Sequence, residues 1–79
     1  MSPAGGPKLP VGLTGFQLAK ALRQLGFKEV DAKGSHVKFQ RDGLRPFPVA
    51  LHKTPIPAGT LRAILRQADL TLQELLGAL

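Results

Sequence analysis

The stretch "HVKFQRDGLRPFPVALH", residues 36–52, decides the fold, because apolar side chains recur in it at every second position. Val37 and Phe39 alternate with polar residues, and a second alternating run begins at Phe47, after the turn sequence Asp-Gly at 42–43. A period of two is typical of a β-strand with one buried face, and Asp-Gly favours a tight turn. The stretch therefore predicts two antiparallel strands joined as a hairpin.

Prolines in the second of these strands determine its register. A proline nitrogen cannot donate to the ladder, so Pro46 and Pro48 must point away from the partner strand, which makes this strand a sheet edge. Because both apolar sets must also share the buried face, the predicted pairs are Phe39 with Phe47 and Val37 with Val49. The connection is then the three-residue loop 42–44, which places Leu44 where a left-handed backbone is usual.

A helix is predicted before the strands, in "LTGFQLAKALRQLGF" at residues 13–27. Thr14 and Gln17 have the spacing of a capping box, and Gly26 is a natural helix stop. The apolar positions expected to face the core are Leu18, Leu22 and Leu25.

Two further helices are predicted at the end of the chain. "GTLRAILRQADL", residues 59–70, has helical periodicity with Thr60 as its expected cap, and "TLQELLGAL", residues 71–79, has a capping box made by Thr71 and Glu74. The apolar positions expected to face the core are Leu61, Ile64, Leu65, Ala68, Leu72, Leu75, Leu76 and Leu79.

A short first strand, marked by Val30 and Ala32, precedes the hairpin. The predicted order is helix, three-stranded antiparallel sheet, helix, short helix: a two-layer α+β domain with helices on one sheet face and the other face open. The double-stranded-RNA-binding domain has the same order. We expect residues 1–8 to form a flexible N-terminal arm and residues 9–79 a single domain, because a chain of 79 residues has room for only one.

Basic residues are concentrated in the middle of the chain. From Lys33 to Arg66 there are seven basic residues and a single acidic one, Asp42, so this stretch accounts for the whole net charge of +6. The basic residues are Lys33, Lys38, Arg41, Arg45, Lys53, Arg62 and Arg66. A positive field of this kind attracts polyanions, RNA or DNA first.

Composition argues against several other classes of function. The absence of cysteine removes disulfides and cysteine-based zinc sites, and it favours a reducing, cytoplasmic setting. No apolar run approaches the roughly 20 residues that cross a bilayer, so no membrane contact is expected. Five acidic residues spread along the chain argue against a carboxylate-bound metal, and we expect neither a metal nor another cofactor.

Proton-transfer catalysis would depend on the two histidines, His36 and His52. In the predicted register His36 lies opposite Ala50 on the same face as Lys38, with His52 diagonally across, roughly 7–8 Å away. Because imidazole exchanges protons near neutrality, His36 is a candidate general base for the 2′-OH of a ribose, with no metal required. The alternative is a plain exposed strand residue, which is the more common role of a lone histidine.

Residues around His36 are candidates for binding the RNA. Lys33, Lys38 or Lys53 would stabilise the negative charge of the phosphorane. Gly34 would let the backbone approach a phosphate, and its N–H with that of Ser35 could donate to phosphate oxygens. Gly34 and Ser35 suit a tight turn between the first two strands equally well.

The motif "KGSHVKF", residues 33–39, resembles that of the HicA family of small toxin ribonucleases, which cleave mRNA. The segment at 13–27 resembles the opening helix of that family, and "HKTPIPAGTLRAILRQADLT", residues 52–71, resembles its closing segment. The resemblance runs from about Leu9 to Leu75. It implies the double-stranded-RNA-binding fold and a paired antitoxin of the HicB type that covers the active surface.

The same resemblance identifies the catalytic histidine as the one in Gly-Ser-His, which is His36 here. Family members often carry a second histidine directly after the first, where this chain has Val37. In "QADL" the chain has Asp69 where a glycine is common in the family. Neither departure affects His36.

We therefore expect a toxin-type endoribonuclease that cleaves mRNA by metal-independent attack of the ribose 2′-OH. Two alternatives stay open: a non-catalytic RNA-binding module, and an adaptor whose basic face docks an acidic protein. The enzyme requires His36, whereas binding alone requires mainly the lysines and arginines.

Overall fold

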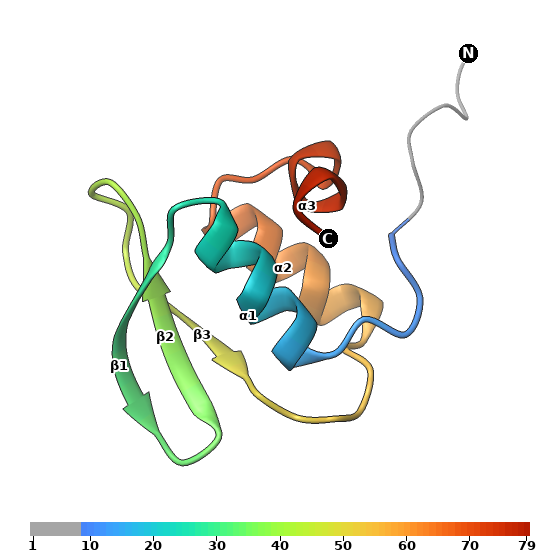
Figure 1. Cartoon of the computed structure of the whole chain (residues 1–79), viewed down its shortest axis with the longest axis horizontal. Helices are drawn as coiled ribbons and strands as arrows, with labels where there is room; N and C mark the ends of the chain where they lie inside the picture. The colour runs from blue at the N-terminus through green and yellow to red at the C-terminus, as the bar shows by residue number, and fades with distance from the viewer. Residues whose placement is uncertain (1–8) are drawn as a thin grey trace.

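The computed structural model describes residues 9–79, and the arm expected at residues 1–8 lies outside the described part. Along the chain the elements are α1 (Gly15–Gln24), β1 (Lys28–Lys33), β2 (His36–Gln40), β3 (Phe47–Ala50), α2 (Ala58–Gln67) and α3 (Leu72–Ala78). The strands form one antiparallel sheet in the order β1-β2-β3. Helices α1 and α2 cover one face of the sheet, and α3 lies at the end of this helix layer (Figure 1). The predicted α+β fold is confirmed.

The capping box predicted for α1 is present. The Thr14 backbone N–H donates to Gln17 Oε1 at 2.9 Å, and the Gln17 N–H donates to Thr14 Oγ1 at 3.2 Å. The first residue of the helix, Gly15, packs directly on β3: a Cβ added there would lie 1.8 Å from the carbonyl oxygen of Ala50. Only glycine lets the start of α1 approach the end of β3 this closely.

The register of the β2–β3 hairpin is the predicted one, with Phe39 opposite Phe47 and Val37 opposite Val49. Their side chains lie on the helix side and are buried, Phe39 completely. Buried apolar residues from both strands and all three helices form one core. Pro48, the proline within β3, therefore points its nitrogen away from β2, as the sequence required.

The turn of this hairpin differs from the prediction. The predicted loop puts Leu44 at a position where a left-handed backbone is usual, but the positive φ angles are at Asp42 (43°) and Gly43 (77°). The Leu44 N–H donates to the carbonyl of Arg41 at 3.0 Å. Positive φ at both central residues is the pattern of a type I′ turn, whose twist matches that of hairpin strands and which Asp-Gly favours. The turn therefore has two central residues instead of the expected three. The register is still the predicted one, because the β3 side carries one extra residue between Leu44 and Phe47.

Strand β1 extends beyond Val30 and Ala32, the two residues that indicated it in the sequence. It runs from Lys28 to Lys33, and every residue in it is exposed. The pairing passes from Glu29 to Asp31, so Val30 is left out of the ladder as a bulge. A bulge on an edge strand increases the local twist and discourages further strand pairing.

Helix α2 begins earlier than predicted. Its N-cap is Pro57 and no side chain caps it, so Thr60 lies within the first turn and is not the cap. The φ of Pro57 is −59°, close to the value that the proline ring imposes and that leads readily into a helix. The predicted apolar stripe of α2 is otherwise buried as expected.

Helix α3 has the predicted capping box between Thr71 and Glu74. Its inward face is narrower than expected: Leu75 is fully buried, but Leu76 and Leu79 are 36% and 53% exposed. Ala78 is buried in their place. A helix of seven residues presents only about two turns to the core, so the adjacent positions necessarily face away.

Candidate active site on the open sheet face

The sheet face that the helices leave uncovered carries His36, the first residue of β2. Its imidazole is exposed, because the next residue, Val37, is buried and side chains alternate along a strand. In the ladder His36 lies opposite Ala50 of β3 on one side and Lys33 of β1 on the other. We call this surface the open face.

A tight turn before His36 is built from Gly34 and Ser35. Gly34 has a φ of +61°, whereas Ser35 is not left-handed, which is the pattern of a type II′ hairpin turn. A Cβ added at Gly34 would meet nothing within 4 Å, so glycine is needed for the backbone conformation and not for space. Both residues lie outside the strands.

The second histidine is held beside the first by this turn. The Leu51 N–H donates to the carbonyl of Ser35 at 2.6 Å, which extends the β2–β3 contact beyond the strand ends. Ser35 Oγ and His52 Nε2 form a hydrogen bond of 3.1 Å. As a result, the rings of His36 and His52 have centroids 6.2 Å apart and lie edge to face at 77°. Both rings are exposed.

Two of the three candidate lysines lie on the strands of the open face. Lys33 is the ladder partner of His36, and Lys38 follows two residues later on the same side of β2. Lys53 follows His52 in the segment between β3 and α2 and therefore lies outside the strands. Within residues 9–79 the only ion pair joins Arg23 to Glu29, so none of the three ammonium groups forms an ion pair, although Asp31 lies opposite Lys38 in the ladder.

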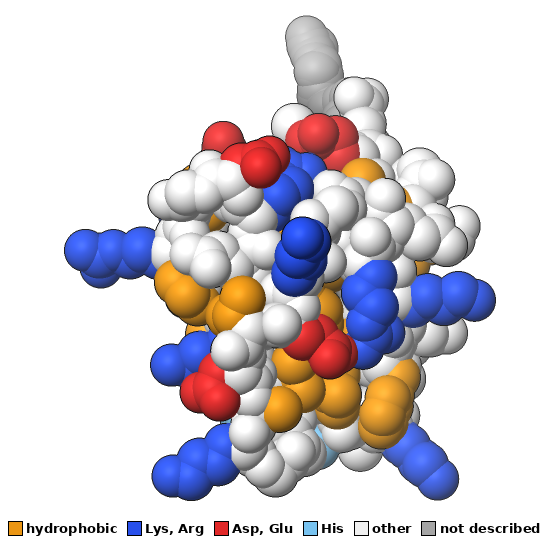
Figure 2. Space-filling model, turned by 60° about the vertical axis from the view of Figure 1, so that its left-hand side comes forward, with side chains coloured by type: hydrophobic (Ala, Val, Ile, Leu, Met, Phe, Trp, Pro, Cys, Tyr) orange, Lys and Arg blue, Asp and Glu red, His pale blue; other side chains and the backbone are white. Residues whose placement is uncertain are grey.

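Not every basic residue of the middle segment belongs to the open face. The guanidinium of Arg41 lies 4.5 Å from the centre of the Phe27 ring and donates to the carbonyl of Leu25 at 2.9 Å, so it ties the end of α1 to the hairpin. Arg62 and Arg66 lie on α2, in the helix layer. Figure 2 shows lysine and arginine side chains projecting in several directions rather than forming one dense cluster.

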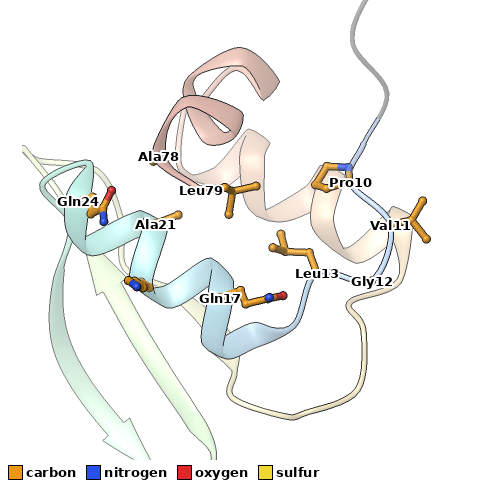
Figure 3. A pocket seen from close by; sticks show the side chains of 10 residues that line it. Pro10, Val11, Gly12, Leu13, Gln17, Ala21, Gln24, Ala78 and Leu79 are labelled. Carbon is orange, nitrogen blue, oxygen red and sulfur yellow. The ribbon is translucent and has the colours of Figure 1, made fainter.

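The larger hollows of the molecule lie away from the histidines. A cavity of about 560 Å³ lies between residues 10–13, one side of α1 and the end of α3, with Leu13, Lys20 and Leu79 among its lining residues (Figure 3). Lys20 is its one titratable lining residue. A smaller cavity of about 100 Å³ adjoins His52. Among residues 9–79, His36 and His52 are the two histidines, and they lie side by side outside the larger of these cavities.

Among residues 9–79, no group of three His, Cys, Asp or Glu side chains is placed to hold a metal ion. No helix in the same range combines the length and the apolar character needed to span a bilayer.

Fold and site together define a small basic domain of the double-stranded-RNA-binding type, with two imidazoles on its open face. Residues 15–70 match the family described as "HicA toxin of bacterial toxin-antitoxin". The chain belongs to the HicA family, whose toxins act as ribonucleases within toxin-antitoxin systems. The matched range includes His36, His52 and the three candidate lysines. No curated protein gives a significant match to the chain.

The sequence did not indicate the contact between Ser35 and His52. It follows from the position of Ser35 in the turn, where the alternation of a strand no longer decides the direction of a side chain. A serine and a histidine 17 residues apart have no spacing that signals this contact.

Proposed function

We propose that the protein is a toxin endoribonuclease that cleaves mRNA, with residues 9–79 acting as one catalytic domain and His36 as general base. The observation that carries this proposal is the exposed imidazole of His36 on the open face, adjacent to lysines that form no ion pair. Family membership supports the ribonuclease class.

In the proposed reaction, an imidazole nitrogen of His36 takes the proton of a ribose 2′-OH. The 2′ oxygen attacks the adjacent phosphorus, the bond from phosphorus to the 5′ oxygen breaks, and the products are a 2′,3′-cyclic phosphate and a 5′-OH. No metal is required, because the nucleophile is part of the substrate and a neutral imidazole can activate it. DNA lacks the 2′-OH, so the proposed substrate is RNA alone.

The surrounding residues are proposed to bind the RNA. Lys33, Lys38 and Lys53 would neutralise phosphates and stabilise the charge that develops on the phosphorane. The N–H groups of Gly34 and Ser35, in the exposed turn before β2, would donate to phosphate oxygens. These contacts position the RNA strand but do not read its bases, so they imply no sequence preference.

A HicB-type antitoxin is the proposed protein partner, as family membership suggests. Such a partner would inhibit the toxin by covering the open face, since RNA could then reach neither His36 nor the lysines. Because mRNA and the antitoxin would both be met in the cytoplasm, we propose that the protein acts there.

The test compares the wild type with His36→Ala on purified RNA, with and without EDTA. The variant should cut at least about 10²-fold more slowly, the usual contribution of general-base catalysis, and should bind uncut RNA as the wild type does. EDTA should leave the wild-type rate unchanged. Equal rates for the two proteins would reject His36 as the base. Binding of RNA by the wild type without any cleavage would favour an RNA-binding module. Failure of the wild type to bind RNA would favour the protein-docking adaptor.

A further inference from the structure

We infer that His52 is a second catalytic residue, the donor of a proton to the leaving 5′ oxygen, and that Ser35 positions it. The inference rests on the proposed function, since it concerns the same cleavage reaction. It is carried by the hydrogen bond between Ser35 Oγ and His52 Nε2 at 3.1 Å and by the 6.2 Å between the two ring centres.

The reaction itself requires two groups in different places. In an in-line displacement the attacking and leaving oxygens lie on opposite sides of phosphorus. A base that takes the proton from the 2′-OH therefore cannot also reach the 5′ oxygen in the same step. An alkoxide is a poor leaving group, so a donor on the far side of the phosphate lowers the barrier considerably.

The two imidazoles are separated suitably for these roles. Each needs one nitrogen within about 2.6–3.2 Å of its oxygen. The ring centroids are 6.2 Å apart, a span over which the two imidazoles can meet different oxygens of one phosphodiester. Both lie on the open face, where a polynucleotide can reach them.

Ser35 determines which nitrogen of His52 is available. In the protonated ring, Nε2–H donates to Ser35 Oγ, and Nδ1–H remains for the substrate. The ring is braced through the backbone as well, because the carbonyl of Ser35 accepts the Leu51 N–H at 2.6 Å and the His52 N–H donates to the Ala50 carbonyl at 3.1 Å. The turn before β2 thus fixes the acid while β2 itself carries the base.

The complete step then balances. The 2′-OH proton moves to His36 as the bond from the 2′ oxygen to phosphorus forms. The bond from phosphorus to the 5′ oxygen breaks, and that oxygen takes the Nδ1 proton of His52. His36 ends protonated and His52 neutral, so a proton must return through solvent or through hydrolysis of the cyclic phosphate before the next turnover.

A lysine is a poorer candidate for the donor. The best proton donor at neutral pH is a group that titrates near that pH, which imidazole does and an ammonium does not. Lys33 and Lys38 therefore suit the role of fixed positive charges. No hydrogen bond within residues 9–79 orients the side chain of Lys53.

The test uses an RNA in which sulfur replaces the bridging 5′ oxygen at one cleavage site. A thiolate leaves without being protonated, so this substrate removes the need for the acid alone. His52→Ala should cut ordinary RNA about 10²- to 10⁴-fold more slowly than the wild type. On the sulfur-containing RNA the cleavage rate of this variant should be within about tenfold of the wild-type rate, because the variant lacks only the acid and this substrate does not need one. His36→Ala should stay slow on both substrates.

These substrates separate the two proposals. If His52→Ala is equally slow on both RNAs, or cuts ordinary RNA at the wild-type rate, His52 is not the donor, whatever the result for His36. If the wild type cuts neither RNA, the proposed function itself is rejected. Thermal unfolding of each variant, compared with the wild type, shows whether a lost rate is merely lost structure.

Ser35 has its own test as a positioning residue. Ser35→Ala should slow cleavage of ordinary RNA by more than it slows cleavage of the sulfur-containing RNA, and Ser35→Thr, which keeps the hydroxyl, should restore part of the loss. A purely structural role would slow both substrates equally, and that outcome would reject the proposed positioning.

Discussion

Asp69 has a backbone conformation that usually requires glycine. It follows the last turn of α2 with a φ of +53°. Its N–H donates to the carbonyl of Arg66 at 3.2 Å, and the N–H of Leu70 donates to that of Leu65 at 2.9 Å, which together form a Schellman motif. Helix α1 ends in the same way, but with Gly26 at the left-handed position, φ +93°.

Asp69→Gly should therefore stabilise the protein. Relief of the left-handed strain is worth about 1–2 kcal/mol, reduced by the greater flexibility of glycine in the unfolded chain, so a net gain of about 0.5–1 kcal/mol is expected. Asp69→Ala should lower stability instead, because alanine keeps the Cβ and loses the local polar side chain. Urea unfolding measures both variants, and a stability of the alanine variant at or above that of the glycine variant would contradict the strain argument.

Lys38 provides a test of phosphate contact at a single residue. Lys38→Ala should weaken RNA binding and reduce the slope of log affinity against log salt by about 0.7, the value for one phosphate contact on a single strand. Lys20→Ala is the matched control, since it removes the same charge from α1, outside the open face. The carboxylate of Asp31, opposite Lys38 in the ladder, accepts the Ala32 N–H at 2.9 Å and forms no ion pair with Lys38, so the ammonium group is available to a phosphate. Identical slopes for the two variants would reject the contact.

At the scale of elements, the close approach of α1 to β3 depends on Gly15. Gly15→Ala would place a methyl group against the backbone oxygen of Ala50, which cannot move away as a flexible side chain could. Overpacking of this kind costs about 1–3 kcal/mol. Since Ala50 is the ladder partner of His36, RNA cleavage should fall as well.

Gly59→Ala serves as the control for Gly15→Ala. Gly59 lies in the first turn of α2, and a Cβ added there meets nothing within 4 Å. Alanine is the better helix former by up to about 1 kcal/mol, so this variant should be equal to the wild type or more stable. Thermal unfolding compares the pair. A neutral effect of Gly15→Ala would mean that α1 and β3 are not in the contact described above.

The capping box of α3 makes its stability dependent on pH. The backbone N–H of Thr71 donates to the carboxylate of Glu74 at 2.9 Å, and this bond lowers the pKa of Glu74 below its ordinary value. The pKa of Glu74 is lower in the folded protein than in the unfolded chain. The carboxylate therefore contributes its full stabilisation of the fold above the ordinary pKa, and this stabilisation is lost as the pH falls through the lowered pKa. The capping box of α1 contains the neutral Gln17 and should not change with pH in this range.

Acid titration of stability should reveal this difference. Between neutral pH and the acid side of the carboxylate range, the wild type should lose more stability than Glu74→Gln, whose amide can accept the same bond at any pH. Chemical unfolding at a series of pH values gives the comparison. Parallel curves for the two proteins would show that the charge of Glu74 contributes nothing to α3.

Elements whose signals are local could be predicted from the sequence, and those that depend on distant contacts could not. The capping residues of α1 and the proline-bearing strand β3 act within a few positions, so the helix start and the hairpin register were right. The start of α2 was wrong because Thr60 resembles a cap while Pro57 begins the helix without any side-chain bond. Leu76 and Leu79 match the helical period of α3, but the core of so small a domain reaches only one side of that helix.

For the candidate site, the sequence indicated the face but not its internal contacts. Alternation with Val37 was enough to place His36 outside, and the register was enough to bring His52 near it. The bond from Ser35 to His52 depends on a turn and a strand end coming together in space. Counting charges overestimated the basic surface, because nothing in the sequence shows that Arg41 stacks on Phe27.

For the whole molecule, the open face is kept in place by a small core on the other side of the same sheet. Phe39 is completely buried on the reverse of β2, the strand that carries His36 and Lys38. A domain of this size buries only about 60% of the surface of its unfolded chain, so one large core side chain represents a considerable part of its stability.

Phe39→Ala should therefore unfold much of the protein, because the loss of about 3–5 kcal/mol is comparable with a total stability that starts at about 5 kcal/mol. Phe16→Ala is the matched control: this ring is 50% exposed on α1, so the same substitution should cost about 1 kcal/mol or less. Urea unfolding and RNA cleavage should be measured on both, beside His36→Ala. Phe39→Ala should lose cleavage and structure together, whereas His36→Ala should lose cleavage alone, since its exposed ring is not part of the core. Equal stability of the two phenylalanine variants would mean that β2 is not anchored through Phe39, and the open face would then need another explanation for its fixed geometry.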